Sequence, residues 1–309
     1  MKVLLTGGSG FIGQHVTQVL LDEGLHVRVF DLLPPSHPHV ESVQGDILDT
    51  VKLERAAIGC DAIVHLAAQV SVSHSVEYPE ETHLNNVVGT QNVLSCAVQS
   101  NIKRIIIASS AAVYGNENRL PLKEETVGSI QSPYAHSKAE NELQVLKARN
   151  EGLEVVALRF FNVYGPHQSI SGGYSAVIPS LINCIMKGIQ PTVHGNGLQT
   201  RDFVHADDVA ASISTFLHAE WSNVESHVYN VATQSQVSII ELIDIINQIC
   251  LETKTIQHQL PPLFRDVRSG DIEHSMANIS KITAHLGWRP TISIHEGLRD
   301  LIEKWRKAE

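Results

Sequence analysis

The first half of the chain alternates short apolar runs with longer amphipathic segments. The runs are rich in Val and Ile and are apolar on both faces, which is typical of strands buried inside a parallel sheet. Strands are predicted at residues 2–7, 26–31, 41–46, 62–68, 103–110 and 154–161. Helices are predicted between them near residues 11–23, 49–58, 80–99 and 134–150. This alternation predicts an α/β fold of the Rossmann type, a doubly wound parallel sheet with helices on both faces.

The pattern changes after about residue 165, where loops rich in Gly and Ser separate shorter apolar runs. Residues 227–233 are predicted as one more core strand, and helices are predicted at 237–251, 278–286 and 293–307. We therefore predict a large domain over residues 1–165, rejoined by parts of 200–235. A smaller, interleaved domain is predicted over residues 166–309.

Composition and charge narrow the classes of function. Of the 309 residues, 43% are hydrophobic and 18% charged, which is ordinary for a globular enzyme or binding protein. The formal net charge is −10 and no basic run occurs, which disfavours nucleic acid and anionic membranes as partners. No apolar run approaches the roughly 20 residues that span a bilayer, and the N-terminus lacks a signal-peptide pattern. A cytoplasmic location is expected.

Cysteines and histidines show no metal-ligand spacing. The four cysteines are scattered and sit mostly among apolar neighbours, which favours buried, reduced thiols: Cys60, Cys96, Cys184 and Cys250. The 17 histidines also stand mostly alone, so no metal site is predicted.

The first predicted strand runs directly into a glycine loop, "LLTGGSGFIG". Gly7 permits a tight turn, Gly10 permits close approach to a pyrophosphate, and Gly13 permits close packing of the following helix. Asp31 ends the second strand, where a carboxylate accepts hydrogen bonds from the adenosine ribose. No arginine follows Asp31, and Arg28 lies in mid-strand, so NAD is favoured over NADP as the cofactor.

Two further segments carry candidate chemistry. In "GDILD", Asp46 and Ile47 are placed at the adenine edge, although a strand end followed by the helix cap Asp49 explains the segment equally well. In "SPYAHSKAE", Tyr134 and Lys138 lie one helical turn apart. A neighbouring ammonium and the nicotinamide ring are expected to lower the pKa of Tyr134 from about 10 toward that of a useful base.

These motifs together resemble the extended short-chain dehydrogenase/reductase superfamily and, within it, the NAD-dependent nucleotide-sugar 4-epimerases of the UDP-glucose 4-epimerase type. The resemblance runs through "TGGSGFIG", "HLAAQVSV", "NNVVGT", "SSAAVYG", "YAHSK", "LRFFNVYGP", "TRDFVHADDVA" and "RSGD". It implies that Tyr134 is the catalytic base, that Lys138 lowers its pKa and holds the nicotinamide ribose, and that Ser110 bonds the reacting sugar hydroxyl.

The resemblance also implies two sets of binding residues. NAD is expected to contact Gly7, Gly10, Phe11, Ile12, Gly13, Asp31, Asp46, Ile47, Leu66, Ala67, Ala68, Asn85, Ser109, Tyr134, Lys138, Phe161 and Val163. The nucleotide sugar is expected to contact Ser110, Asn162, Val177, His194, Arg201, Arg268, Asp271 and Ser275. The arginines suit this role because a guanidinium matches phosphate oxygens, although each could instead form a surface ion pair.

Ala111 and Ala112 follow Ser110, where sugar-nucleotide dehydratases resemble one another in an acidic pair and decarboxylases in a glutamate. A methyl group cannot transfer a proton, so both reactions lose their expected acid–base groups. Epimerisation at C4 of a nucleotide sugar, through a transient 4-keto intermediate, needs only the tyrosine and the cofactor. The alternatives are an NAD(H)-dependent sugar-nucleotide reductase or dehydrogenase and, in another class, a non-catalytic dinucleotide-binding sensor.

The resemblance suggests the substrate as well. UDP-glucose and UDP-galactose are expected, and Ser275 stands where a small residue admits a 2-acetamido group, as in UDP-GlcNAc and UDP-GalNAc. His194 replaces the aromatic ring that relatives often place over uracil, which makes UDP less secure as the carrier. A homodimer is expected through the helices predicted at 80–99 and 134–150.

Overall fold

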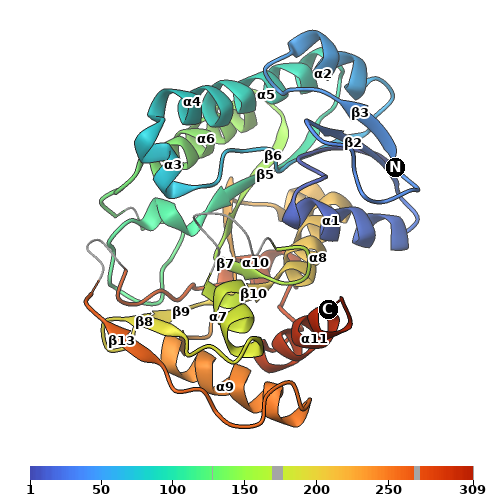
Figure 1. Ribbon diagram of the computed structural model, residues 1–309. Helices are drawn as coiled ribbons and strands as arrows, with labels where there is room; N and C mark the ends of the chain where they lie inside the picture. Colours follow the sequence, from blue (N-terminus) through green and yellow to red (C-terminus); the bar gives the residue numbers. More distant parts are fainter. Residues whose placement is uncertain (127, 169–176, 268–271, 309) are drawn as a thin grey trace.

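The computed structural model describes residues 1–126, 128–168, 177–267 and 272–308. Its centre is a seven-stranded sheet in which neighbouring strands are all parallel (Figure 1). From one edge to the other the strands are β11 (Val228–Val231), β6 (Glu154–Phe160), β5 (Arg104–Ser110), β4 (Ala62–His65), β1 (Lys2–Thr6), β2 (His26–Asp31) and β3 (Glu41–Gln44). The doubly wound parallel sheet predicted from the sequence is confirmed.

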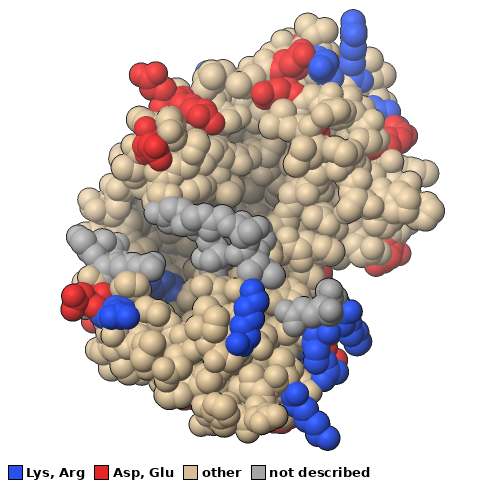
Figure 2. All heavy atoms as spheres, in the orientation of Figure 1, with Lys and Arg blue, Asp and Glu red and all other residues tan. Residues whose placement is uncertain are grey.

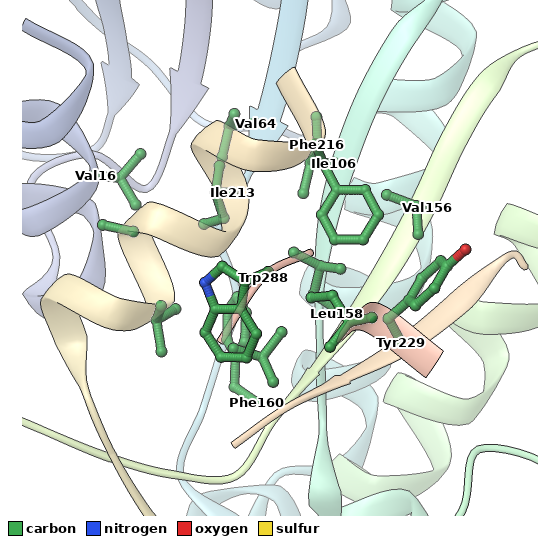
Figure 3. Packing of buried hydrophobic residues seen from close by; sticks show 14 of the residues in the cluster. Val16, Val64, Ile106, Val156, Leu158, Phe160, Ile213, Phe216, Tyr229 and Trp288 are labelled. Carbon is green, nitrogen blue, oxygen red and sulfur yellow. The ribbon is translucent and has the colours of Figure 1, made fainter. Parts of the chain in front are cut away.

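Helices cover both faces of this sheet. One face packs against α1 (Phe11–Asp22) and α8 (Ala206–His218), and the other against α2 (Thr50–Ala57), α5 (Gly89–Gln99) and α6 (Pro133–Asn150). Side chains of successive strand residues point to opposite faces of the sheet. Val3 and Leu5 belong to the first core, on the side of α1 and α8, and Leu4 belongs to the second core, on the side of α2, α5 and α6. Figure 3 shows the first core, where side chains of α1 and α8 meet those of the strands. Each fully buried Val, Leu, Ile or Phe contributes about 1.5–3 kcal/mol.

The rest of the chain builds a smaller part with its own apolar core, below the sheet in Figure 1. Its helices are α7 (Val177–Met186), α9 (Ile239–Glu252) and α11 (Ile294–Ala308). Short strands form three two-stranded pairs: β7 (Asn162–Tyr164) with β10 (Phe203–His205), β9 (Thr200–Arg201) with β12 (Val237–Ser238), and β8 (Thr192–His194) with β13 (Leu263–Arg265). The remaining elements are α3 (Val72–Glu77), α4 (Pro79–His83), η1 (Leu84–Val88), η2 (Ala111–Tyr114), η3 (Trp221–Asn223) and α10 (Ser280–Leu286).

Among the described residues, three α-helices were not predicted, and one predicted helix is interrupted. The unpredicted helices are α3, α7 and α8. Helix α8 begins after His205, whose ring caps the helix in place of a usual Ser, Thr, Asp or Asn. Its apolar residues Val209, Ile213 and Phe216 nonetheless recur at helical spacing and are buried. The helix predicted at 80–99 is divided into α4, a π-helical turn (η1) and α5. Such π turns often occur at functional sites.

Candidate active site

A cavity of about 700 Å³ lies at the carboxyl ends of the central strands, where ligands bind in open α/β sheets. In Figure 2 the molecule is hollowed between its upper and lower parts, and the described side chains around the hollow are mostly uncharged. The residues that the sequence assigned to NAD all line the cavity: Gly7, Gly10, Phe11, Ile12, Gly13, Asp31, Asp46, Ile47, Leu66, Ala67, Ala68, Asn85, Ser109, Tyr134, Lys138, Phe161 and Val163. Ser110 and Asn162, which were assigned to the substrate, line it too.

The glycine loop forms one wall of the cavity, and two of its glycines leave no space for a side chain. Gly7 has a φ of +76°, and a β-carbon on it would lie 2.5 Å from the Ala67 nitrogen. A β-carbon on Gly13 would lie 2.2 Å from the Gly7 carbonyl oxygen, so α1 can approach the loop only with glycine there. Gly10 precedes α1 and no side chain caps that helix, which leaves its first N–H groups to bind an anion. The loop therefore fits a dinucleotide pyrophosphate.

Asp31 stands beside this loop at the end of β2. Its carboxylate accepts hydrogen bonds from the backbone N–H groups of Ser9 and Leu33, each at 3.0 Å. The remaining lone pairs of the two oxygens can accept ribose hydroxyls. The Arg28 guanidinium is bound to Glu41 and to backbone carbonyls of α2 and the residue after it, with N–O distances of 2.6–2.8 Å. Arg28 is therefore committed elsewhere, which agrees with NAD rather than NADP.

In the "GDILD" segment, one carboxylate caps a helix and another lines the cavity. Asp49 caps α2 by accepting a hydrogen bond from the Lys52 N–H at 3.0 Å. Asp46 lines the cavity, and its Oδ1 accepts the Leu48 N–H at 2.9 Å. Because the cap is supplied by Asp49, Asp46 keeps a free oxygen beside the cavity, where the adenine edge was predicted.

A buried histidine, next in sequence to the cavity-lining Leu66, was not identified from the sequence. The ring of His65, at the end of β4, lies 2.7 Å from the Thr6 hydroxyl and 3.0 Å from the Thr90 hydroxyl. Thr90 donates its own proton to the Asn86 carbonyl at 2.6 Å, so it accepts from Nε2 while Thr6 donates to Nδ1. Burial, with a smaller effect of the Lys138 charge, lowers the pKa of His65 to about 3. The ring is therefore neutral and joins β1, β4 and α5.

The π turn places Asn85 and Asn86 in different roles. Asn85 lines the cavity, as predicted from the sequence. Asn86 is buried and exchanges hydrogen bonds with the backbone of Gln69, at 2.8 and 2.9 Å, and donates to the Ser137 hydroxyl at 3.0 Å. Asn86 thus fixes the loop after β4 against α6. Gln69 also lines the cavity and was missed, because an isolated glutamine in a loop gives no pattern.

Ser110, Tyr134 and Lys138 meet at one side of the cavity. Helix α6 begins as expected: the Ser132 hydroxyl accepts the Ala135 N–H at 3.1 Å, and Pro133 takes the first helical position. This start places Tyr134 and Lys138 on the face that packs toward β5 and β6. The Lys138 ammonium donates to the backbone carbonyl of Ala108 at 2.8 Å, two residues before Ser110.

Without the cofactor, the protein side chains do not lower the pKa of Tyr134. Burial raises the pKa of Tyr134, and a hydrogen bond with Ser110 opposes this rise. Burial likewise lowers the pKa of Lys138 to about 8, against the charge of Glu142. The lowered pKa of Tyr134 predicted from the sequence does not arise from the protein side chains alone, because desolvation outweighs them.

None of the other predicted substrate residues that the structure describes lines this cavity. His194 ends β8, and its Nδ1 donates to the Asp266 carbonyl at 3.0 Å. Arg201 ends β9, and Ser275 is buried with its N–H donated to the Thr200 carbonyl at 3.1 Å, so these two lie close together. Val177 begins α7 and packs on the core of the smaller part. Arg268 and Asp271 lie outside the described residues.

The described part of the chain shows neither a metal-ligand cluster nor a membrane-spanning helix. No group of three or more His, Cys, Asp or Glu side chains there could hold a metal ion. Among the helices in the same ranges, none is both long and apolar enough to cross a membrane.

Comparison with known proteins gives consistent relatives. The sequence profile of the NAD dependent epimerase/dehydratase family matches residues 3–232. UDP-glucose 4-epimerase from Lactobacillus helveticus is 31% identical over 332 residues, which cover 100% of this chain and 98% of that protein. Human dTDP-D-glucose 4,6-dehydratase is 30% identical over 324 residues, which cover 99% of this chain and 90% of that protein.

Among solved structures, the fold is similar to that of the UDP-N-acetylglucosamine 4-epimerase from Methanobrevibacter ruminantium, in complex with UDP-N-acetylmuramic acid. The TM-score is 0.91 at 33% sequence identity, and the match covers 100% of this chain and 99% of the other. The similarity therefore extends through the smaller part as well as the sheet.

Proposed function

The chain belongs to the NAD dependent epimerase/dehydratase family, and we propose that it is an NAD-dependent UDP-sugar 4-epimerase. One observation carries the proposal: Tyr134, Lys138 and Ser110 meet beside a cavity that fits the dinucleotide, while the residues that follow Ser110 are alanines. The set provides one proton-transferring group and no second acid–base pair.

In this proposal each side chain has a separate task. The Tyr134 phenolate would accept the proton of the C4 hydroxyl, and the resulting phenol would later return it to the 4-keto sugar. The Ser110 hydroxyl, which is hydrogen-bonded with Tyr134, orients the same sugar oxygen. The Lys138 ammonium supplies the positive charge that favours the phenolate. NAD, held by the glycine loop, Asp31 and Lys138, would supply reversible hydride transfer at C4 of the sugar.

The alanines separate this reaction from dehydration and decarboxylation. Ala111 and Ala112 open the short helix η2, and the Ser110 hydroxyl accepts the Ala112 N–H at 3.1 Å. Their methyl groups therefore follow Ser110 without an intervening residue and cannot move a proton. Dehydration needs an acid for the departing hydroxyl and a base for the adjacent carbon, so epimerisation is favoured although a dehydratase is among the relatives.

We propose that the substrates are UDP-glucose and UDP-galactose and that their 2-acetamido counterparts are accepted. The small side chain of Ser275 and the similarity to a UDP-N-acetylglucosamine 4-epimerase support the wider range. If Ser275 borders the sugar, Ser275→Tyr should reduce turnover of UDP-GlcNAc far more than that of UDP-glucose. Equal effects on both sugars would contradict this assignment.

The decisive experiment incubates the purified protein, without added cofactor, with UDP-glucose and separately with UDP-GlcNAc. Proton NMR of the anomeric region should show the corresponding C4 epimers. No epimer from either sugar, even with NAD added, would contradict the proposal. Net consumption of NADH, in parallel mixtures to which NADH is added, would instead support the reductase alternative.

We also propose that different segments of the chain bind the cofactor and the nucleotide sugar. Residues 1–165, with parts of 200–235, would bind the cofactor, and residues 166–309 would mainly bind the nucleotide sugar. Two observations support it: β11 completes the central sheet, and Gln168 is the one lining residue of the cavity, among those described, that follows residue 165.

A homodimer through α5 and α6 completes the proposal. Exposed apolar side chains form two stripes at helical spacing. One stripe, on η1 and α5, consists of Leu84, Val88 and Val98, and the other, on α6, consists of Leu143 and Leu146. A second copy would cover both stripes as a helical bundle.

Light scattering should give about twice the chain mass of 33.9 kDa. Leu143→Glu should give the mass of one chain, whereas Ile189→Glu, at an exposed residue outside the stripes, should not. A monomeric wild-type protein would contradict the dimer.

A further inference from the structure

A buried ion pair lies behind the catalytic side chains. Glu142 follows Lys138 by one turn of α6, and its side chain is buried together with that of Arg159 on β6. The Arg159 guanidinium donates to both carboxylate oxygens, from Nε at 2.8 Å and from Nη2 at 2.7 Å. A bidentate pair of this kind is rigid and fixes both side chains.

Glu142 makes a third bond that an isolated structural pair does not need. Its Oε1 also accepts the hydroxyl proton of Ser109, at 2.5 Å. Ser109 precedes Ser110, and the residue before it, Ala108, accepts the Lys138 ammonium. Helix α6 is therefore tied to two consecutive residues of β5 immediately before Ser110, once through Glu142 and once through Lys138.

The carboxylate also acts through its charge. Lys138 is buried and hydrogen-bonded to a neutral carbonyl, so desolvation favours loss of its proton. The negative charge of Glu142 opposes that loss.

We propose that Glu142 is a positioning residue of the active site, which keeps Lys138 charged and holds the Ser110 end of β5 against α6. The inference deepens the proposed function, since it assigns the support of the same catalytic group. Arg159 fixes the Glu142 carboxylate, and Ser109 transmits its position to Ser110.

The first test measures the proton affinity of Lys138 without any turnover. Competitive labelling with acetic anhydride across pH, read by mass spectrometry of the peptide that contains Lys138, gives the midpoint of its titration. Glu142→Gln should lower this midpoint by about one pH unit or more, since a nearby charge is removed. Glu142→Asp keeps the charge and should lower it less. A folded Glu142→Gln protein with the wild-type midpoint would overturn the charge role.

The second test covers the case in which Glu142→Gln does not fold. A Lys138 midpoint in Glu142→Asp equal to that of the wild-type protein would then overturn the charge role, because moving the carboxylate away should lower the midpoint. Ser109→Ala leaves the ion pair whole and tests the positioning role. It should reduce kcat about tenfold with KM nearly unchanged, because orientation and not binding is altered. An unchanged kcat would overturn the positioning role.

These outcomes separate the inference from the proposed function. If the wild-type protein epimerises no UDP-sugar but Glu142→Gln shifts the Lys138 midpoint, the proposed function fails and the charge role remains. If epimerisation occurs and neither variant changes the midpoint or kcat, the proposed function holds and the role of Glu142 is refuted.

Discussion

Acid should destabilise this protein through His65, whose neutral ring joins β1, β4 and α5. Burial lowers the pKa of His65 to about 3, while the same side chain in an unfolded chain titrates near 6.5. As the pH falls below about 6.5, the unfolded chain gains a proton that the folded protein resists until about pH 3. The stabilisation is therefore complete above the unfolded value and is lost progressively as the pH falls toward the folded value.

The magnitude follows from the size of the shift. A difference of about 3.5 pKa units corresponds to about 5 kcal/mol when the window is crossed completely. Between about pH 7 and pH 4 the loss from this residue is about 3 kcal/mol. That is a large fraction of the roughly 5–15 kcal/mol that stabilises a typical domain.

Urea denaturation followed by circular dichroism at several pH values measures this loss. Other groups titrate in the same range, so the informative quantity is the difference between wild type and His65→Gln. At neutral pH the variant should be less stable by about 1–3 kcal/mol, since its amide cannot satisfy both Thr6 and Thr90. By about pH 4 the gap should close or reverse, because only the wild type carries the cost of a buried titrating ring.

A substitution at an exposed histidine provides the control for this pH dependence of stability. His136 is exposed on α6, so His136→Gln should leave the pH dependence of stability unchanged. If the curves of wild type and His65→Gln stay parallel from neutral to acid pH, His65 does not titrate differently in the folded state. The argument from its burial and two threonine hydrogen bonds would then be wrong.

Three further changes test the site itself. Gly13→Ala should weaken cofactor binding and lower the melting temperature, because its β-carbon would lie 2.2 Å from the Gly7 carbonyl oxygen; NADH fluorescence and calorimetry would show this, and wild-type values would contradict it. Tyr134→Phe should reduce kcat for epimerisation by about a hundredfold or more while the affinity for UDP-sugar, from calorimetry, changes little; a retained kcat would exclude this base. Asp31→Ser should reduce the affinity for NAD by about tenfold and improve that for NADP, since a carboxylate repels a 2′-phosphate; an unchanged preference between the two would refute that role.

The features that the sequence predicted well depend on neighbouring residues. The strand β5 is recognisable because three consecutive isoleucines are buried on alternate faces of the sheet. The glycine loop is recognisable because a tight turn between a strand and a helix needs glycine at fixed positions. Such signals lie within a few residues of one another, and the structure assembles them at one cavity.

The features that were missed depend on contacts distant in sequence. Nothing near His65 indicates that Thr6 and Thr90 will surround its ring, and Glu142 meets Arg159 only after β6 returns to the sheet. The burial that raises the pKa of Tyr134 in the protein without cofactor was missed for the same reason, because burial is a property of the whole fold. Helix α8 is the local exception, since its apolar spacing was present but its cap is unusual.

The path of the chain through the sheet determines how the molecule can come apart. After β6 the chain leaves the sheet, builds β7, α7 and the short strands, and returns through α8 and β11 before leaving again. In addition, the Asp208 carboxylate of α8 accepts backbone N–H groups of Thr291 and Ile292 in the C-terminal segment. Unfolding of the smaller part would withdraw these anchors from the sheet and expose the face that packs on α1. We therefore expect the two parts to unfold in one cooperative transition, in which opening of either part loosens the cofactor cavity.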